Sequence, residues 1–408
     1  MKLSDKIMNM KSSAIRKLDP YSDEAIAKGK TVLNLNIGQP DIETPDIFFE
    51  SLKSFDHKVL KYSESRGENI LINSLINYYE DINISLKKEN MIITNGGSEA
   101  LTFAFLAICN PGDEVLAPEP FYTNYNSFAD ISGAKIKPFK TKRENGFRLP
   151  TRQEIESHIN PKTKGILFSN PSNPTGTVYS KEEIQMLRDI ALEHNLYIIS
   201  DEVYREFVYD NREYYSPMYE KSIEDRVILI DSISKRYSSC GARVGLFASK
   251  NVELVDAVMK LAQSRLAAPT IEQYAAAMLY NTPQTYFDEV LRKYEKRRDV
   301  LYNELNAIDG VELTKPEGAF YVIAKLPVDS AEDFSKWILK DFDLGGTTVK
   351  IAPAKGFYST KGKGENEVRL SYCINKKDLV LAAKILKNAL IEYNSIFEIE
   401  TKKAAALG

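Results

Sequence analysis

Residue types that would define a disulfide scaffold or a metal site are scarce in this chain. The three cysteines show no CxxC spacing, and one would be left over in any pairing: Cys109, Cys240 and Cys373. This favours a reducing cytosol over a disulfide-stabilised secreted protein. The three histidines are scattered along the sequence: His57, His158 and His194. We therefore expect no metal site and a cytoplasmic location.

Long apolar runs and a dominant charge are also lacking. No stretch approaches the roughly 20 apolar residues that span a bilayer. The start, MKLSDKIMNMKSS, has no apolar core of roughly 7–15 residues, as a secretory signal would. The net charge is −3, from 54 basic and 57 acidic residues that are interleaved, so we expect no nucleic-acid-binding face. Small molecules are the expected partners, without membrane or nucleic acid.

The chain does contain a regular alternation of short apolar runs and amphipathic stretches. Six runs read as strands: Met91–Thr94, Glu114–Ala117, Gly165–Ser169, Leu196–Ser200, Val227–Ile230 and Val244–Ala248. Helical patterns lie between them, as at Glu99–Ile108 and Lys181–His194. Strand–helix–strand repetition predicts an α/β fold whose mostly parallel sheet is sandwiched by helices. We assign it to a large domain at residues 50–290.

The pattern changes after about residue 290. A long charged helix at Val290–Ile308 leads into apolar stretches around Phe320–Ile323 and Val368–Tyr372, and a closing helix begins at Lys377. We expect a smaller α+β domain at residues 291–400, to which residues 1–49 contribute. A chain of 408 residues is long for one domain, which agrees with this division.

Polar clusters follow three successive candidate strands. Asn170–Gly176 comes after the strand that ends at Ser169, Asp201–Tyr204 after the next, and Asp231–Lys235 after the third. In an open α/β sheet, ligands bind beyond the carboxyl ends of the strands. The sequence therefore predicts one site that receives an amide, a carboxylate, a phenol and a lysine.

A series of motifs extends along roughly residues 15–390: Asn36-Ile-Gly-Gln-Pro-Asp41, Tyr62 with Gly67, Asn95-Gly-Gly-Ser-Glu-Ala100, Pro120-Phe-Tyr122, Asn173-Pro-Thr-Gly176, Asp201-Glu-Val-Tyr204, Ser232-Ile-Ser-Lys235, Arg243 and Arg369. In content and order, these motifs resemble those of fold-type-I, class I/II aminotransferases, enzymes that depend on pyridoxal 5′-phosphate. The resemblance implies a large cofactor-binding domain with a smaller α+β domain.

By this resemblance, Lys235 carries the cofactor covalently and moves the substrate's α-proton as general base and acid. Such chemistry needs an amine that is neutral near pH 7, so we expect burial and nearby cations to depress its pKa. Asp201 would keep the pyridine nitrogen protonated, which makes the ring an electron acceptor. Tyr204 and Asn173 would hydrogen-bond the ring's phenolic oxygen. Glu202 is expected to be structural.

The resemblance also implies a phosphate cup. Gly97 and Ser98 lie where a strand passes into a helix, whose N-terminus favours an anion, and Arg243 would pair with the phosphate through its planar fork of donors. Ser232 would complete the cup, with Ser234 as a weaker candidate. Tyr62 matches a tyrosine that reaches the partner's phosphate, which implies a homodimer with shared active sites.

Four further residues bear on the substrate. Tyr122 is expected to stack on the cofactor, where aspartate aminotransferases carry tryptophan. Gly38 and Arg369 resemble the site of the α-carboxylate, together with Asn173. Arg265 resembles an arginine that aspartate aminotransferases send into the partner's site, although it is displaced by about two positions. A structural ion pair for Arg265 is an equal alternative.

These assignments predict an aminotransferase that moves the amino group of an L-amino acid, aspartate first, to 2-oxoglutarate by ping-pong half-reactions. Aromatic or broad donor specificity is the alternative, as are β-elimination from cysteine-like substrates or decarboxylation on the same scaffold. A ligand-sensing regulatory module is the rival from another class. Because the pattern begins close to Met1, we expect no preceding DNA-binding domain. A catalytically inactive homologue is disfavoured because all the expected polar groups are present.

Overall fold

A seven-stranded sheet forms the centre of the larger part of the molecule, with strand order β2-β8-β7-β6-β5-β3-β4. The computed structural model describes residues 1–10 and 13–407, without the side chains of Asn9 and of residues 397–407. The strands are β2 (Met91–Asn95), β3 (Glu114–Glu119), β4 (Lys135–Lys140), β5 (Thr163–Ser169), β6 (Tyr197–Asp201), β7 (Val227–Ser232) and β8 (Val244–Ala248). Only β8 runs antiparallel to its neighbours within this described sheet, so the predicted mostly parallel sheet is confirmed.

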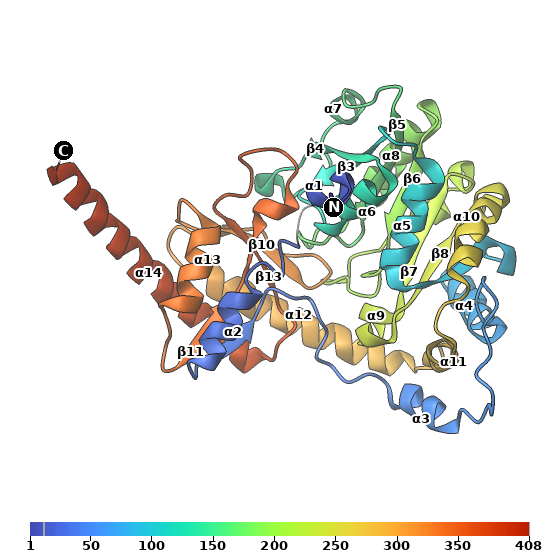
Figure 1. Ribbon diagram of the computed structural model, residues 1–408, viewed down its shortest axis with the longest axis horizontal. Coiled ribbons are helices and arrows are strands. Elements are labelled where there is room, and N and C mark those ends of the chain that lie inside the picture. Colours follow the sequence, from blue (N-terminus) through green and yellow to red (C-terminus); the bar gives the residue numbers. More distant parts are fainter. Residues whose placement is uncertain (11–12, 408) are drawn as a thin grey trace.

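Helices cover both faces of this sheet (Figure 1). One face packs against α5 (Gly96–Ile108), α6 (Asn124–Ser132) and α10 (Val252–Arg265), the other against α4 (Asn69–Asp81), α8 (Lys181–Glu193) and α11 (Thr270–Leu279). Successive strand residues point to opposite faces, so Ile92 joins the first core and Ile93 the second. Burial on both faces is the reason the strands read as continuous apolar runs.

The smaller part combines both ends of the chain. Its four-stranded sheet has the order β12-β13-β10-β9, built from β9 (Glu312–Leu313), β10 (Tyr321–Lys325), β12 (Ala352–Pro353) and β13 (Glu367–Ser371). A separate parallel pair joins β1 (Thr31–Asn34) to β11 (Thr347–Lys350). The surrounding helices are α2 (Asp19–Ala27), α13 (Ala331–Lys340) and α14 (Lys376–Leu407).

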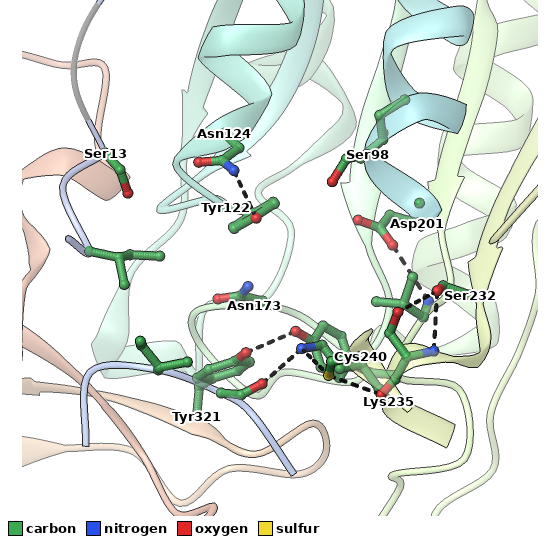
Figure 2. A pocket seen from close by; sticks show the side chains of 18 of the residues that line it. Ser13, Ser98, Tyr122, Asn124, Asn173, Asp201, Ser232, Lys235, Cys240 and Tyr321 are labelled. Carbon is green, nitrogen blue, oxygen red and sulfur yellow. Dashed lines mark hydrogen bonds between the residues drawn. The ribbon is translucent and has the colours of Figure 1, made fainter. Parts of the chain in front are cut away.

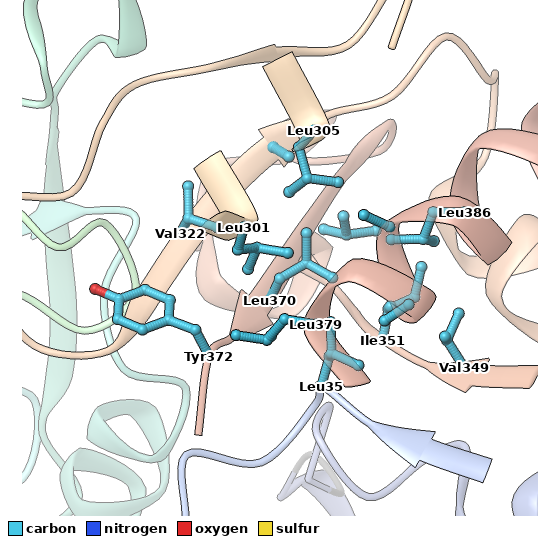
Figure 3. Close-up of a cluster of buried hydrophobic side chains, with 14 of the residues drawn as sticks. Leu35, Leu301, Leu305, Val322, Val349, Ile351, Leu370, Tyr372, Leu379 and Leu386 are labelled. Atoms are coloured by element: carbon cyan, nitrogen blue, oxygen red, sulfur yellow. The ribbon is translucent and has the colours of Figure 1, made fainter. Parts of the chain in front are cut away.

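The larger hydrophobic core of the smaller part joins segments from both ends of the chain (Figure 3). Leu35, from the N-terminal segment, packs in the same cluster as Leu301, Leu370 and Leu386. Leu301 lies on α12 (Gln284–Asn306), the long helix that runs from this region toward α11 in Figure 1. The N-terminal segment thus contributes to this core, while the proposed domain limits at residues 50, 290 and 400 stay a prediction.

Short elements complete the chain. The remaining α-helices are α1 (Asp5–Asn9), α3 (Asp46–Ser54), α7 (Arg152–Glu156) and α9 (Ile233–Arg236). Single 3-10 turns lie at Lys88–Asn90, Arg143–Asn145, Pro217–Tyr219, Lys221–Ile223, Cys240–Ala242 and Ala354–Phe357. Within the described ranges, no helix combines the length and the apolar character needed to cross a bilayer.

Candidate active site

A cavity of about 500 Å³ lies at the carboxyl ends of the parallel strands, where the two parts of the molecule meet. The larger part supplies the first turn of α5 and the segments that follow β5, β6 and β7. The smaller part supplies Tyr321 from β10 and Arg369 from β13. The predicted residues that line this cavity are Gly38, Gly97, Ser98, Tyr122, Asn173, Asp201, Tyr204, Ser232, Lys235, Arg243 and Arg369.

Lys235 lies on α9, the single helical turn that follows β7. Its Nζ donates to the carbonyl oxygen of Gly38 at 2.8 Å and lies 3.7 Å from Cys240 Sγ (Figure 2). Burial lowers the pKa of Lys235, whereas Tyr321, Cys240 and other nearby thiol and phenol groups raise it. Their combined effect is larger than that of burial, so the pKa lies above its ordinary value. The predicted depressed pKa is therefore wrong for the free chain, because acidic groups and a carbonyl, rather than cations, surround the amine.

Asp201 ends β6 and is buried. Its Oδ2 accepts a hydrogen bond from the Tyr125 hydroxyl at 2.7 Å. Burial raises the pKa of Asp201 to about 6, although the Tyr125 hydrogen bond opposes the shift. A carboxylate with a raised pKa at a cavity wall is stabilised by a cation placed beside it. The cavity therefore offers Asp201 as the partner of a positively charged ring nitrogen.

Tyr204 and Tyr321 bring the two parts of the molecule together beside Lys235. Their hydroxyl groups are hydrogen-bonded at 2.9 Å, and both side chains are buried. A Cβ atom on Gly38 would lie 1.8 Å from the Tyr321 hydroxyl oxygen. Only glycine at position 38 leaves room for the Tyr321 side chain. Gly38 was predicted from the sequence, whereas Tyr321 was not.

The first turn of α5 meets Ser232 and Arg243 at one end of the cavity. A Cβ atom on Gly245 of β8 would lie 2.7 Å from the Gly97 nitrogen, so glycine permits the close contact of β8 with this turn. Ser232 Oγ is hydrogen-bonded to Ser234 Oγ at 2.8 Å. Arg243 has a φ of 53° and donates to the carbonyl oxygen of Cys240 at 2.9 Å. Helix N–H groups, hydroxyls and a guanidinium together form an anion site.

Arg369 is only 1% exposed and has no carboxylate partner among the described residues. Its Nη1 donates to Asn173 Oδ1 at 3.1 Å, and its Nη2 donates to the carbonyl oxygen of Asn36. Its Nε is buried without a hydrogen-bond partner, and its guanidinium lies 4.4 Å from the centre of the Tyr321 ring. A buried cation with a free donor is strongly stabilised by an anion, so Arg369 provides a second anion site.

Two predicted residues lie outside the cavity of their own chain. The side chain of Tyr62 is 83% exposed. Arg265 ends α10, and its Nη2 donates to the backbone oxygens of Ile93 at 3.1 Å and Ser65 at 3.4 Å, while Nη1 lies 3.5 Å from Glu99 Oε2. These contacts favour a structural role for Arg265. The reach of either residue into a partner's site stays a prediction.

The remaining predicted residues have clear surroundings. Tyr122 lines the cavity, and its hydroxyl accepts from Asn124 Nδ2 at 2.9 Å. Glu202 is fully buried away from the cavity, where it accepts from the Ser200 hydroxyl at 2.9 Å and pairs with Arg205. Cavity-lining residues that the sequence did not indicate include Arg16, Asn124, Cys240 and Tyr321.

Comparisons with known proteins identify the family. The family described as aminotransferase class I and II matches residues 30–385. A protein of Methanocaldococcus jannaschii named as a probable aspartate aminotransferase is 34% identical over 395 residues, covering 94% of this chain and 99% of the relative. The structure of Thermus thermophilus aspartate aminotransferase with maleate superposes with a TM-score of 0.87 at 27% identity, covering 95% of this chain and all of the other. Alanine aminotransferase from Pyrococcus furiosus gives the same TM-score at 28% identity, with coverage of 96% and 100%. The chain belongs to the class I and II aminotransferases.

Members of this family are pyridoxal-phosphate-dependent transaminases, and the cavity fits this cofactor. The α5 anion site suits a phosphate, and Asp201, with its raised pKa, suits a protonated ring nitrogen. Lys235 supplies an amine at the wall of the same cavity. The free Nε of Arg369 leaves a donor for a substrate carboxylate.

Proposed function

We propose that this aminotransferase moves the amino group of a dicarboxylic amino acid, aspartate first, to 2-oxoglutarate in two half-reactions. The observation that carries this proposal is that two separate cationic groups, Arg243 and Arg369, line the same cavity as Lys235. A phosphate and an α-carboxylate each need such a partner. Several relatives bear the name aspartate aminotransferase, which supports aspartate as the donor.

In the proposed site, Gly97, Ser98, Ser232 and Arg243 hold the phosphate. Asp201 would pair with the ring nitrogen, Tyr204 and Asn173 would hydrogen-bond the phenolic oxygen, and Tyr122 would stack on the ring. Pyridoxal phosphate, when bound, supplies an electron-accepting ring that stabilises the charge left when the α-proton departs. The chain's own residues would then provide the proton transfers.

Lys235 is the proposed base and acid because its Nζ is the amine at the cavity wall. In the free chain its pKa is raised, so a neutral amine requires the electrostatics of the loaded site. Arg369 would hold the α-carboxylate through its free Nε, with Asn173 fixing the guanidinium plane. This contact would orient the Cα–H bond toward Lys235.

We also infer a homodimer with shared sites. Tyr62 is exposed beside two exposed apolar residues, Val59 and Leu60. Adjacent exposed apolar side chains are typical of a protein-binding surface. A second copy of this chain would cover them and would bring Tyr62 to the partner's phosphate site.

A panel of amino donors assayed against 2-oxoglutarate tests the proposed reaction. Aspartate should give the highest kcat/KM, and adding it alone should convert the cofactor to the pyridoxamine form, seen as a change in absorbance. A preference for tyrosine or phenylalanine would move the assignment to an aromatic aminotransferase. Release of sulfide and pyruvate from cysteine, without the pyridoxamine form, would instead identify a β-lyase.

A further inference from the structure

The charges that line the cavity are unbalanced. Four cationic side chains line it, Lys235, Arg243, Arg369 and Arg16, against one carboxylate among the described lining residues, Asp201. The proposed function uses the first three for the cofactor and the α-carboxylate. Arg16 is exposed, and no hydrogen bond or ion pair joins its guanidinium to any other described residue. Arg16 is therefore the one of these four cations to which the proposed function gives no anionic partner.

The residues on either side of Arg16 contact the smaller part of the molecule. The carbonyl oxygen of Ile15 accepts from Asn36 Nδ2 at 3.2 Å, and Lys17 Nζ pairs with Glu332 Oε1 at 2.6 Å. Arg16 thus has a defined place on the cavity wall, while its side chain stays free to bind. The backbone oxygen of Asn36 also accepts a hydrogen bond from Arg369. Asn36 therefore contacts both Arg369 and the residue that precedes Arg16.

Building on the proposed function, we propose that Arg16 binds the distal carboxylate of the dicarboxylic substrate, within the same subunit. A guanidinium binds a carboxylate through two parallel hydrogen bonds. With the α-carboxylate at Arg369, a second carboxylate would neutralise the remaining cation of the cavity. A donor with a methyl or aromatic side chain would leave Arg16 without a partner, so the residue would select for acidic substrates.

Arg265 is the competing candidate, and its position argues against it within one subunit. Its Nη2 donates to backbone oxygens of Ile93 and Ser65, and Glu99 lies near Nη1. Its Nε and Nη1 are buried without a hydrogen-bond partner, but Arg265 does not line the cavity of its own chain. Arg16 does line this cavity.

The test compares the holoenzyme with its Arg16→Gln, Arg16→Lys and Arg265→Gln variants. Arg226→Gln is the matched control, because Arg226 lies just before the amino end of β7 and pairs with Asn195, away from the cavity. Two quantities are measured for each protein: kcat/KM for aspartate and for alanine, and the equilibrium affinity for maleate and for propionate. Maleate and propionate report binding without turnover.

Arg16→Gln should lower kcat/KM for aspartate and the affinity for maleate by about 10- to 100-fold, the range expected for one hydrogen-bonded charged pair. Alanine and propionate should change by less than about threefold, because neither has a distal carboxylate. Arg16→Lys should recover part of the loss, and Arg226→Gln should behave as the wild type.

An equal loss for aspartate and alanine, or no loss for either, would overturn the role of Arg16. A selective loss of aspartate activity in Arg265→Gln alone would give the role to Arg265. Both outcomes leave the proposed function intact. By contrast, a wild-type enzyme that prefers neutral donors and binds maleate no better than propionate would refute the dicarboxylic donor itself.

Discussion

Removing the charge of Asp201 should stabilise the cofactor-free protein against unfolding. The same change should abolish the activity of the cofactor-loaded enzyme. The pKa of Asp201 is raised from 3.8 to about 6, mainly by burial. Above pH 6 the folded protein therefore holds a buried carboxylate that is more stable in the unfolded chain. With 1.36 kcal/mol for each pKa unit, this carboxylate costs the folded state about 3 kcal/mol at pH 8.

The sign of the pH dependence follows from the same shift. Because the folded state binds the proton more tightly, the free energy of unfolding falls as the pH rises from about 4 to about 6. Asp201→Asn keeps an oxygen for the Tyr125 hydroxyl but removes the charge. The free energy of unfolding of this variant should exceed that of the wild type by about 3 kcal/mol at pH 8 and by less than about 1 kcal/mol at pH 4.

Urea unfolding of the cofactor-free proteins, followed by circular dichroism at fixed protein concentration, measures this difference. Asp288→Asn is the control, because Asp288 is exposed and such surface changes usually stay within about 0.5 kcal/mol. An Asp201→Asn variant that is no more stable than the wild type at pH 8 would refute the reasoning. So would an advantage that does not change between pH 4 and pH 8.

Four other changes test the site. Borohydride reduction should fix the cofactor on Lys235, as located by mass spectrometry, and Lys235→Ala should lose several orders of magnitude in turnover; an adduct on another lysine would contradict the assignment. Mixing inactive Tyr62 and Lys235→Ala variants should restore partial activity once subunit exchange is verified, and no recovery would count against shared sites. Arg265→Ala should lower the free energy of unfolding by about 1.5–3 kcal/mol, the range for hydrogen bonds to a charged group, and lower activity toward all donors equally; a loss confined to aspartate would show substrate binding instead. Gly38→Ala should displace Tyr321, since its Cβ would lie 1.8 Å from that hydroxyl, and should reduce kcat even where the variant melts like the wild type.

The sequence predicts the larger sheet well because its information is local. Strands such as β5 and β7 are buried apolar runs that end in polar residues, so both the strand and the site beyond it can be read from adjacent residues. The strand β4 is missing from the prediction because its sequence, KIKPFK, is polar and contains Pro138. Both features are typical of an edge strand, and β4 lies at the edge of the sheet.

The parts of the site that escaped prediction come from tertiary contacts. Tyr321 lies in an apolar stretch that reads as core, and only the meeting of β10 with the larger part turns its hydroxyl toward Tyr204. Tyr125 lies in the first turn of α6, three residues after Tyr122, yet nothing local shows that it contacts Asp201, 76 positions later. For Arg16 no motif exists at all. The raised pKa of Lys235 likewise depends on neighbours from distant segments.

The pairing of β1 with β11 has a consequence for how the protein is made. Thr31 pairs with Thr347, and at roughly 5–20 residues per second the ribosome needs about 15–60 s to travel between them. All seven strands of the large sheet are complete by Ala248, so that sheet can form while β1 still lacks its partner. We expect a nascent chain arrested before Thr347 to expose residues 31–35 to protease, whereas the full-length chain protects them. The segment that carries Arg16 is thus among the first to be synthesised and among the last to reach its place.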